Sequence, residues 1–160
     1  MIKDTKSTEI SELTKRTDKS MKNIIMNDSY LLKEESKKLI NILKDKGISE
    51  DMIFDIHVGF EEALRNAMIH GNKLDVQKKV IVDVELTDDF IVICVEDEGD
   101  GFDPDMIPDP TLEENLLDER GRGVYLITHL MDEVEYKNEG RCVMMKKFFN
   151  KEYLKKRNKI

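Results

Sequence analysis

The segment at residues 61–72, with the sequence EEALRNAMIHGN, is the feature that most constrains what this chain can fold into. It places an acid, Glu62, and a carboxamide, Asn66, four residues apart. Residues at this spacing lie one above the other on a helix, so both side chains would point into the same cleft. An exposed helix face is the alternative, because polar pairs at this spacing are common on solvated helices. The choice between the two depends on two glycine-rich segments further along the chain.

The first glycine-rich segment is DEGDGF, at residues 97–102. It follows the apolar run FIVICVE, which predicts a β-strand, so Asp97 lies where that strand ends and the chain turns on Gly99 and Gly101. Glycine lets the backbone turn sharply and approach a ligand closely. An acidic hairpin loop is the alternative, since Asp-Gly pairs are frequent in such turns.

The second glycine-rich segment is GRGVYLITHL, at residues 121–130. It begins with Gly121, Arg122 and Gly123, and its apolar residues then recur at helical spacing. Free backbone amides and the positive end of the helix dipole form an anion site where a helix begins. These residues therefore predict a phosphate-binding helix start, to which Arg120 and Arg122 would add positive charge. The Arg122 side chain either contacts a phosphate or remains solvated.

Residues 102–120 join the two glycine-rich segments and contain all three prolines of the chain together with many acids. An irregular segment of this length is unusual within a compact domain and often serves as a lid over a site. We expect a lid that becomes ordered when a nucleotide or a partner binds, and a disordered insertion is the alternative.

The three segments, in this order and spacing, resemble the nucleotide site of the GHKL ATPase superfamily, which includes gyrase, Hsp90, MutL and the histidine kinases. The similarity is greatest to the anti-sigma factor serine/threonine kinases, in which an acid and an asparagine precede an HG or HA pair. The matching residues here are Glu62, Asn66, His70 and Gly71. The resemblance covers residues 28–149 and implies a Bergerat-type (GHKL) fold with a site for ATP and Mg²⁺.

The resemblance also implies a role for each segment. Glu62 would be the catalytic residue, acting as general base or orienting group for the attacking hydroxyl. Asn66 would hold Mg²⁺ through its carboxamide oxygen, which is a hard neutral ligand. Asp97 would accept a hydrogen bond from the exocyclic amine of adenine, which favours ATP over GTP. The other residues implied to bind the nucleotide are His70, Gly99, Gly101, Gly121, Arg122 and Gly123.

The rest of the sequence predicts an α+β fold. Apolar periodicity and stop signals predict helices from Ser29 to Gly47 and from Ser49 to Gly71, and a third helix after the lid. Strands are predicted at residues 80–86 and 90–96, in a last hairpin turning at 138–140, and in a short first strand at 23–26. The helices would cover one side of a mainly antiparallel sheet, as in a two-layer sandwich. We expect a mobile arm at residues 1–22, one GHKL domain at 23–150 and a basic tail at 151–160.

The composition indicates which kinds of partner and which cellular location to expect. The formal net charge of −8 and the pI of about 5.0 argue against a nucleic-acid surface, which needs clustered Lys and Arg. The sequence has no uninterrupted apolar stretch of membrane-spanning length, so no membrane association and a cytoplasmic location are expected. Cys94 and Cys142 lie in apolar, strand-like runs and are expected in the core rather than in a metal site.

By resemblance, we expect an ATP-binding anti-sigma factor that sequesters an RNA polymerase sigma factor. It would phosphorylate a serine or threonine of a small anti-anti-sigma (STAS-type) protein and form a homodimer. Two alternatives remain open. One is a non-catalytic, ATP-gated protein-binding switch. The other is an isolated histidine-kinase catalytic domain, which would fit better with a separate helical hairpin carrying the histidine; here His57 lies on the same predicted helix as Glu62.

Overall fold

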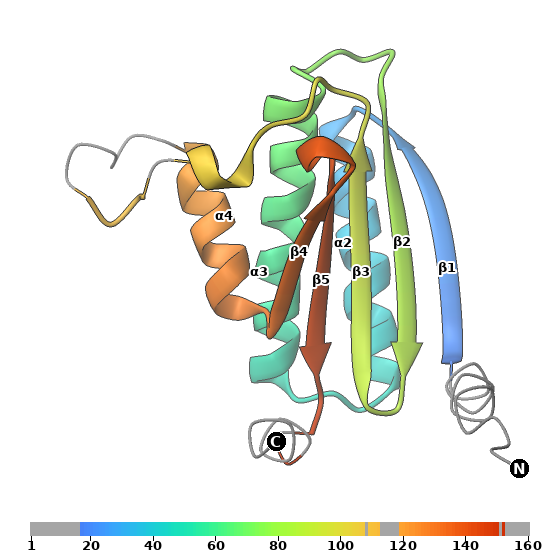
Figure 1. Ribbon diagram of the computed structural model, residues 1–160. Helices are drawn as coiled ribbons and strands as arrows, with labels where there is room; N and C mark the ends of the chain where they lie inside the picture. Colours follow the sequence, from blue (N-terminus) through green and yellow to red (C-terminus); the bar gives the residue numbers. More distant parts are fainter. Residues whose placement is uncertain (1–16, 108, 113–118, 151, 153–160) are drawn as a thin grey trace, which may run out of the picture.

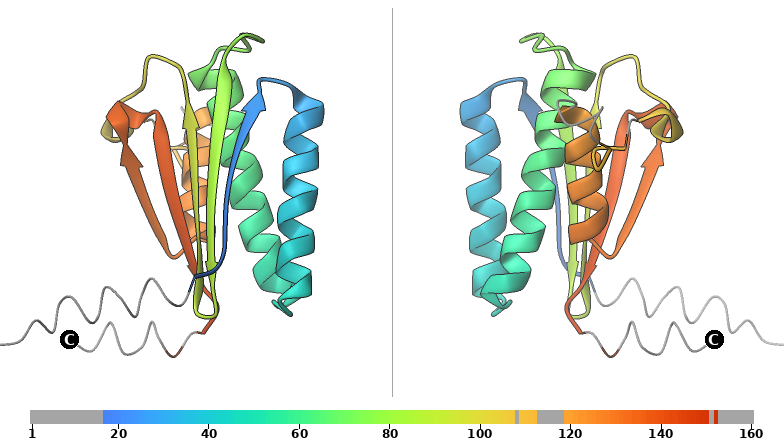
Figure 2. Two further views of the ribbon diagram at one scale, coloured as in Figure 1. Left: turned by 90° about the vertical axis from the view of Figure 1, so that its right-hand side faces the viewer. Right: turned by 90° about the vertical axis from the view of Figure 1, so that its left-hand side faces the viewer.

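The computed structural model describes residues 17–107, 109–112, 119–150 and 152 (Figure 1). Within these residues, five antiparallel strands form one sheet in the order β1-β2-β3-β5-β4. The strands are β1 (Thr17–Met26), β2 (Lys79–Thr87), β3 (Phe90–Asp97), β4 (Glu133–Lys137) and β5 (Cys142–Phe148). The α-helices α2 (Ser29–Asp45), α3 (Glu50–Arg65) and α4 (Glu119–Leu130) lie on one face of the sheet (Figure 2). This two-layer α+β arrangement confirms the predicted fold class.

The core lies between the sheet and the helices. In β3, Ile91, Ile93 and Val95 are buried while the residues between them are half-buried, which is the period-two pattern of a strand with one covered face. Leu43 of α2 and Phe60 of α3 belong to the same hydrophobic cluster and are almost fully buried. Burial of these apolar side chains therefore fixes which face of the sheet the helices cover.

Short polar signals set the ends of the first two helices. Asp28 caps α2 by accepting a hydrogen bond from the backbone N–H of Tyr30 at 2.7 Å. Ser49 caps α3 by accepting one from the N–H of Met52 at 3.4 Å. Gly47, with a φ of +80°, ends α2 in the left-handed conformation that glycine tolerates best. The predicted stop at Gly47 and the predicted start at Ser49 are confirmed.

The α3 helix continues into a wider turn, η1 (Asn66–Gly71), which is π-helical. The N–H of Asn72 donates to the carbonyl of Ala67, five residues earlier, at 2.7 Å. Such turns are rare and are frequent at functional sites. The predicted end of this helix near Gly71 is confirmed, but its apolar spacing did not predict the wider turn.

Asn72 ties the end of this turn to two strands. Its side chain is fully buried, its Nδ2 donates to the carbonyl of Lys79 at 2.9 Å, and its Oδ1 accepts from the N–H of Glu98 at 2.8 Å. Lys79 begins β2, and Glu98 directly follows β3. One side chain therefore holds the end of η1 against the end of the strand that carries Asp97.

The fold differs from the prediction in two details. β1 begins at Thr17 rather than at Asn23, so residues 17–22 belong to the sheet and not to the predicted arm. Pairing with β2 outweighs the weak strand propensity of these polar residues, because strand preference depends strongly on context. Cys142 is buried as expected, whereas Cys94 is only half-buried. Residues 1–16 of the arm and residues 151 and 153–160 of the tail lie outside the described residues.

None of the helices described combines the length and the apolar character that a membrane span requires.

Replacing Asn72 with alanine should lower the free energy of unfolding by roughly 2–4 kcal/mol, because the N–H of Glu98 and the carbonyl of Lys79 would lose a buried partner. Urea denaturation followed by circular dichroism measures this change. Gln77→Ala is a matched control in the same segment, since Gln77 is exposed and should change stability by no more than about 0.5 kcal/mol. Equal small effects of both substitutions would show that Asn72 does not hold the two strand ends.

Candidate nucleotide-binding site

The acid and the carboxamide predicted to form a site lie together. Glu62 is in the last turn of α3, and Asn66 is the first residue of η1. Both line a cavity of about 470 Å³, and the Glu62 side chain is 15% exposed. Its Oε1 atom accepts a hydrogen bond from the guanidinium of Arg65 at 2.8 Å. The other residues that line this cavity are Arg65, Ile69, His70, Glu119, Arg122 and Leu126.

Gly123 of α4 brings the second glycine-rich segment against this pair. A Cβ atom at this position would lie 2.9 Å from Glu62 Oε2, 3.0 Å from Asn66 Nδ2 and 3.1 Å from Asn66 Oδ1. These distances are shorter than ordinary van der Waals contacts, so any larger residue would push against both polar side chains. The absence of a side chain at Gly123 is therefore what lets α4 lie directly against the polar pair on α3.

The second glycine-rich segment lies inside α4 rather than ahead of it. The helix begins at Glu119, earlier than predicted, so Gly121 and Gly123 are buried in its first turns while Arg122 between them is exposed. Glu119 and Arg122 both line the cavity of Glu62, which places the N-terminal end of α4 at its opening. The helix dipole and the N–H groups of a first turn attract anions, and the phosphate-binding role predicted for this segment stays a prediction. The preceding part of the predicted lid, residues 113–118, lies outside the described residues.

Asp97, at the end of β3, lies deep at the other end of the site. It is 8% exposed, and its Oδ1 accepts a hydrogen bond from the N–H of Gly99 at 2.8 Å. A Cβ atom on Gly71 would collide with the Asp97 carboxylate, and one on Gly99 would collide with the carbonyl of Gly71. Burial raises the pKa of Asp97, and the hydrogen bond from Gly99 opposes that rise. The structure therefore brings the HG end of η1 and the first glycine-rich segment together around a buried carboxyl group.

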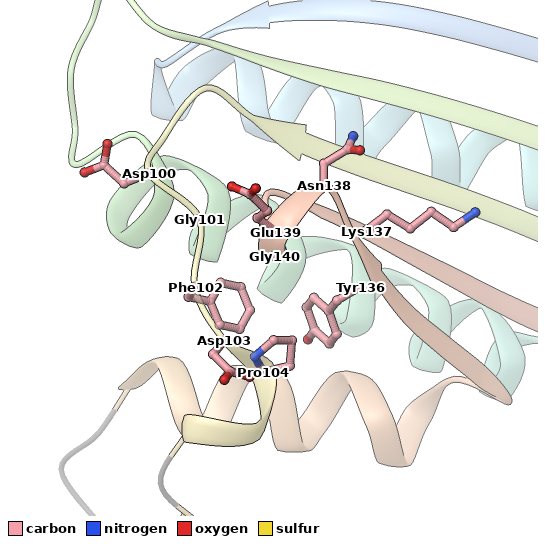
Figure 3. Close-up of a pocket in the computed structure, with 10 residues that line it drawn as sticks. All are labelled: Asp100, Gly101, Phe102, Asp103, Pro104, Tyr136, Lys137, Asn138, Glu139 and Gly140. Carbon is pink, nitrogen blue, oxygen red and sulfur yellow. The ribbon is translucent and has the colours of Figure 1, made fainter.

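The first glycine-rich segment ends against the turn between β4 and β5. Gly101 has a φ of +81°, and the N–H of Phe102 donates to the carbonyl of Glu139 at 2.9 Å. The Phe102 ring meets the ring of Tyr136, on β4, edge to face at a centroid distance of 5.3 Å (Figure 3). An open groove of about 560 Å³ lies outside this contact. The residues that line the groove are Asp100 to Pro104 and Tyr136 to Gly140 (Figure 3).

The side chains of the site suit a metal ion that arrives with a nucleotide. Among the described residues, no group of three or more His, Cys, Asp or Glu side chains is placed to hold a metal ion. The Asn66 carboxamide supplies one hard, neutral oxygen, and Mg²⁺ in nucleotide sites takes most of its other ligands from phosphates and water. The residues present therefore fit Mg²⁺ bound together with ATP better than an independent metal centre.

Two residues of the site, Arg65 and Asn72, were not predicted from the sequence. Arg65 holds the Glu62 carboxylate, and Asn72 fixes the loop around Asp97. Arg120 was expected to add charge beside the phosphates, but its contact with the Phe102 ring, at 3.7 Å from the centroid, was not predicted. The position of Arg65, three residues after Glu62, was a usable signal, because residues at this spacing are neighbours on a helix. The contacts of Asn72 and Arg120 join segments that are far apart in the chain, so no local pattern indicates them.

The fold and the site define a nucleotide-binding domain in which an acid and an amide on one helix face a glycine-containing helix. A family model described as the histidine kinase-like ATPase domain matches residues 32–147. Serine-protein kinase RsbW of Bacillus licheniformis is 36% identical over 123 residues, which cover 71% of this chain and 76% of that protein. The RsbW kinases of Bacillus subtilis (strain 168) and Staphylococcus aureus (strain Newman) are each 34% identical, and the matches cover 76% and 79% of those proteins.

A solved structure of the RsbU and RsbW domains of Rv1364c from Mycobacterium tuberculosis matches with a TM-score of 0.57. The match covers 82% of this chain and 32% of that longer chain at 16% identity, so it bears on the fold alone. The identity and coverage of the kinase relatives show the family as well as the fold. This chain belongs to the histidine kinase-like ATPase family and, within it, to the RsbW serine-protein kinases.

Gly123→Ala should weaken Mg–ATP binding by roughly 10- to 100-fold, because the added methyl group overpacks against Glu62 and Asn66 at a cost of about 1–3 kcal/mol. Isothermal titration calorimetry measures the affinity. Gly47→Ala is the matched control: its φ of +80° should cost about 1 kcal/mol of stability, but nothing lies within 4 Å of the added atom. Unchanged binding by the Gly123 variant would mean that the distance between α3 and α4 does not matter for the site.

Proposed function

We propose that this protein is an ATP-binding anti-sigma factor with protein serine/threonine kinase activity. It would sequester an RNA polymerase sigma factor and phosphorylate a serine or threonine of an anti-anti-sigma (STAS-type) protein. The observation that carries the proposal is the pair Glu62 and Asn66, held together beside Gly123 at a cavity of about 470 Å³. The RsbW relatives, which carry the name serine-protein kinase, support the kinase activity over a histidine-kinase fragment.

Four side chains of the cavity would each have a distinct part in phosphoryl transfer. Mg–ATP, when bound, supplies the phosphoryl group and the metal charge that neutralises its oxygens. Asn66 would hold the metal through its Oδ1 atom. Glu62 would orient the acceptor hydroxyl and take its proton, since the reaction needs mainly positioning and charge stabilisation. The N-terminal end of α4 and Arg122 would receive the phosphates, and His70 would line their site.

At the other end of the site, Asp97 would read the base. A buried carboxylate accepts a hydrogen bond from the exocyclic amine of adenine but finds no donor in the carbonyl of guanine. Gly99 and Gly101 would allow the backbone to lie close to the base. These properties favour ATP over GTP.

The surface of the protein has properties that suit binding to other proteins and to a second copy of the chain. β1 is an edge strand of the sheet, and its Ile24 and Met26 are 62% and 42% exposed. Exposed apolar residues on an edge strand are suited to a protein interface, which supports a homodimer. The net charge of −8 favours protein over nucleic-acid partners. A protein that binds a sigma factor works beside RNA polymerase, so we place it in the cytoplasm.

One observation favours a second candidate, an ATP-gated switch without phosphoryl transfer. The hydrogen bond from Arg65 occupies one oxygen of the Glu62 carboxylate. If Arg65 kept this place while ATP was bound, Glu62 would be less available to the acceptor hydroxyl. Nucleotide binding would then act on a partner only through a shift between conformations.

Glu62→Gln should preserve Mg–ATP binding but reduce phosphoryl transfer roughly a hundredfold or more, because glutamine has nearly the same shape but cannot accept the proton. The measurement is incorporation of labelled phosphate into an anti-anti-sigma protein encoded in the same genome, at saturating ATP.

Glu61→Gln is the matched control for this variant, since Glu61 pairs with His57 at 2.8 Å rather than lining the cavity. It should transfer phosphate at the parental rate. Parental activity in the Glu62 variant would refute the catalytic role. A parent protein that binds ATP but transfers no phosphate to any such partner would favour the switch.

Asp97→Asn should weaken ATP binding more than GTP binding, because the substitution removes the charge-assisted acceptor for the adenine amine. Calorimetry with both nucleotides tests this, and Asp100→Asn in the same turn is the control, because the Asp100 side chain is 85% exposed. Burial raises the pKa of Asp97. ATP affinity of the parent should therefore begin to fall, as the pH decreases, above the usual aspartate pKa of about 3.9. Equal losses for both nucleotides would mean that Asp97 only shapes the turn.

A further inference from the structure

Three side chains from three parts of the chain, Phe102, Arg120 and Tyr136, lie in contact beside Asp97. The guanidinium of Arg120, in the first turn of α4, lies over the face of the Phe102 ring, with Cζ 3.7 Å from the centroid. The other partner of Phe102 is Tyr136, whose ring meets it at an interplanar angle of 77° (Figure 3). A guanidinium placed over an aromatic face is attracted by the negative charge on that face. Arg120 therefore covers one face of the Phe102 ring, next to the contact of that ring with Tyr136.

The space between these three side chains and Asp97 is small. The space that Phe102, Arg120 and Tyr136 share with Asn66 and Asp97 has a volume of about 20 Å³. A cavity of this size holds about one water molecule. A purine ring is several times larger, so adenine cannot reach the Asp97 carboxylate while Arg120 remains on Phe102.

The positive charge of Arg120 also interacts favourably with the Asp97 carboxylate. Burial raises the pKa of Asp97, and the nearby positive charges of Arg120 and Arg141 oppose that rise. Adenine would supply a neutral amine where the guanidinium now supplies a cation. A bound adenine would therefore interact with the same two groups that Arg120 interacts with when no nucleotide is bound, the face of the Phe102 ring and the Asp97 carboxylate.

We propose that Arg120 sets the affinity of this protein for nucleotide, because its guanidinium competes with adenine for the space between Phe102 and Asp97. The inference rests on the proposed function, in which Asp97 reads the base. Binding then includes the displacement of Arg120 from the ring, and the free energy of that contact is subtracted from the affinity. A partly desolvated contact of this kind corresponds to a loss of about three- to tenfold in affinity.

The test is calorimetric titration of Mg–ATP and Mg–ADP into the parent and into Arg120→Ala. We expect the variant to bind both nucleotides about three- to tenfold more tightly. Lys137→Ala is the control, because it also removes one positive charge near Tyr136 but lies in the outer groove and not in the small cavity. It should bind like the parent.

A second variant keeps the test decisive if the alanine variant folds poorly. Arg120→Met keeps an unbranched side chain but removes the charge and the planar group, so it too should bind nucleotide more tightly. Cooperative unfolding without nucleotide verifies that each variant is folded. Equal or weaker binding by a folded Arg120 variant would overturn the inference, and weaker binding would mean that Arg120 contacts the nucleotide. If the parent itself binds no Mg–ATP, the proposed function fails instead.

Discussion

The close approach of α4 to α3 at Gly123 is the constraint on which the rest of the site depends. Glu62 Oε2 and both polar atoms of Asn66 lie so close to position 123 of α4 that a Cβ atom there would have to displace them. This approach puts the N-terminal end of α4, with its attraction for anions, at the same cavity as the acid and the amide. A site assembled from two helices in this way is positioned by backbone packing, which is more exact than positioning by a flexible loop.

The opposite end of the site depends on a second constraint of the same kind. The π-helical turn η1 ends at Gly71, and the buried side chain of Asn72 then joins β2 to the residue after β3. Gly71 and Gly99 leave just enough space for the Asp97 carboxylate between them. The helix that carries Glu62 and Asn66 is therefore continuous with the support of Asp97, so the two ends of the site are held at a fixed separation by one stretch of chain.

Much of this arrangement could be predicted from local patterns. The hairpins and the helices follow from alternation of apolar residues, from Gly47 and Ser49, and from helical spacing. The wider turn η1 could not be predicted, because its geometry depends on contacts of Asn72 with two distant strands. The early start of β1 had the same cause, since pairing with β2 determines it. The residue types and their spacing indicated where the site lies. Only the tertiary structure shows that Arg65 and Arg120 contact its residues.

The two acids of the site are each accompanied by an arginine, although by different means. Arg65 donates directly to Glu62 from the same helix, while Arg120 acts on Asp97 through space from the first turn of α4. An anionic nucleotide with its metal ion offers new partners to all four groups. The binding free energy gained from these partners is reduced by the free energy of the contacts that are lost. This loss is larger for Arg120, which lies against the Phe102 ring, than for Arg65, whose side chain is 53% exposed. If nucleotide binding displaces these two arginines, as we propose for Arg120, the affinity depends on the contacts that they lose as well as on the residues that hold the ligand.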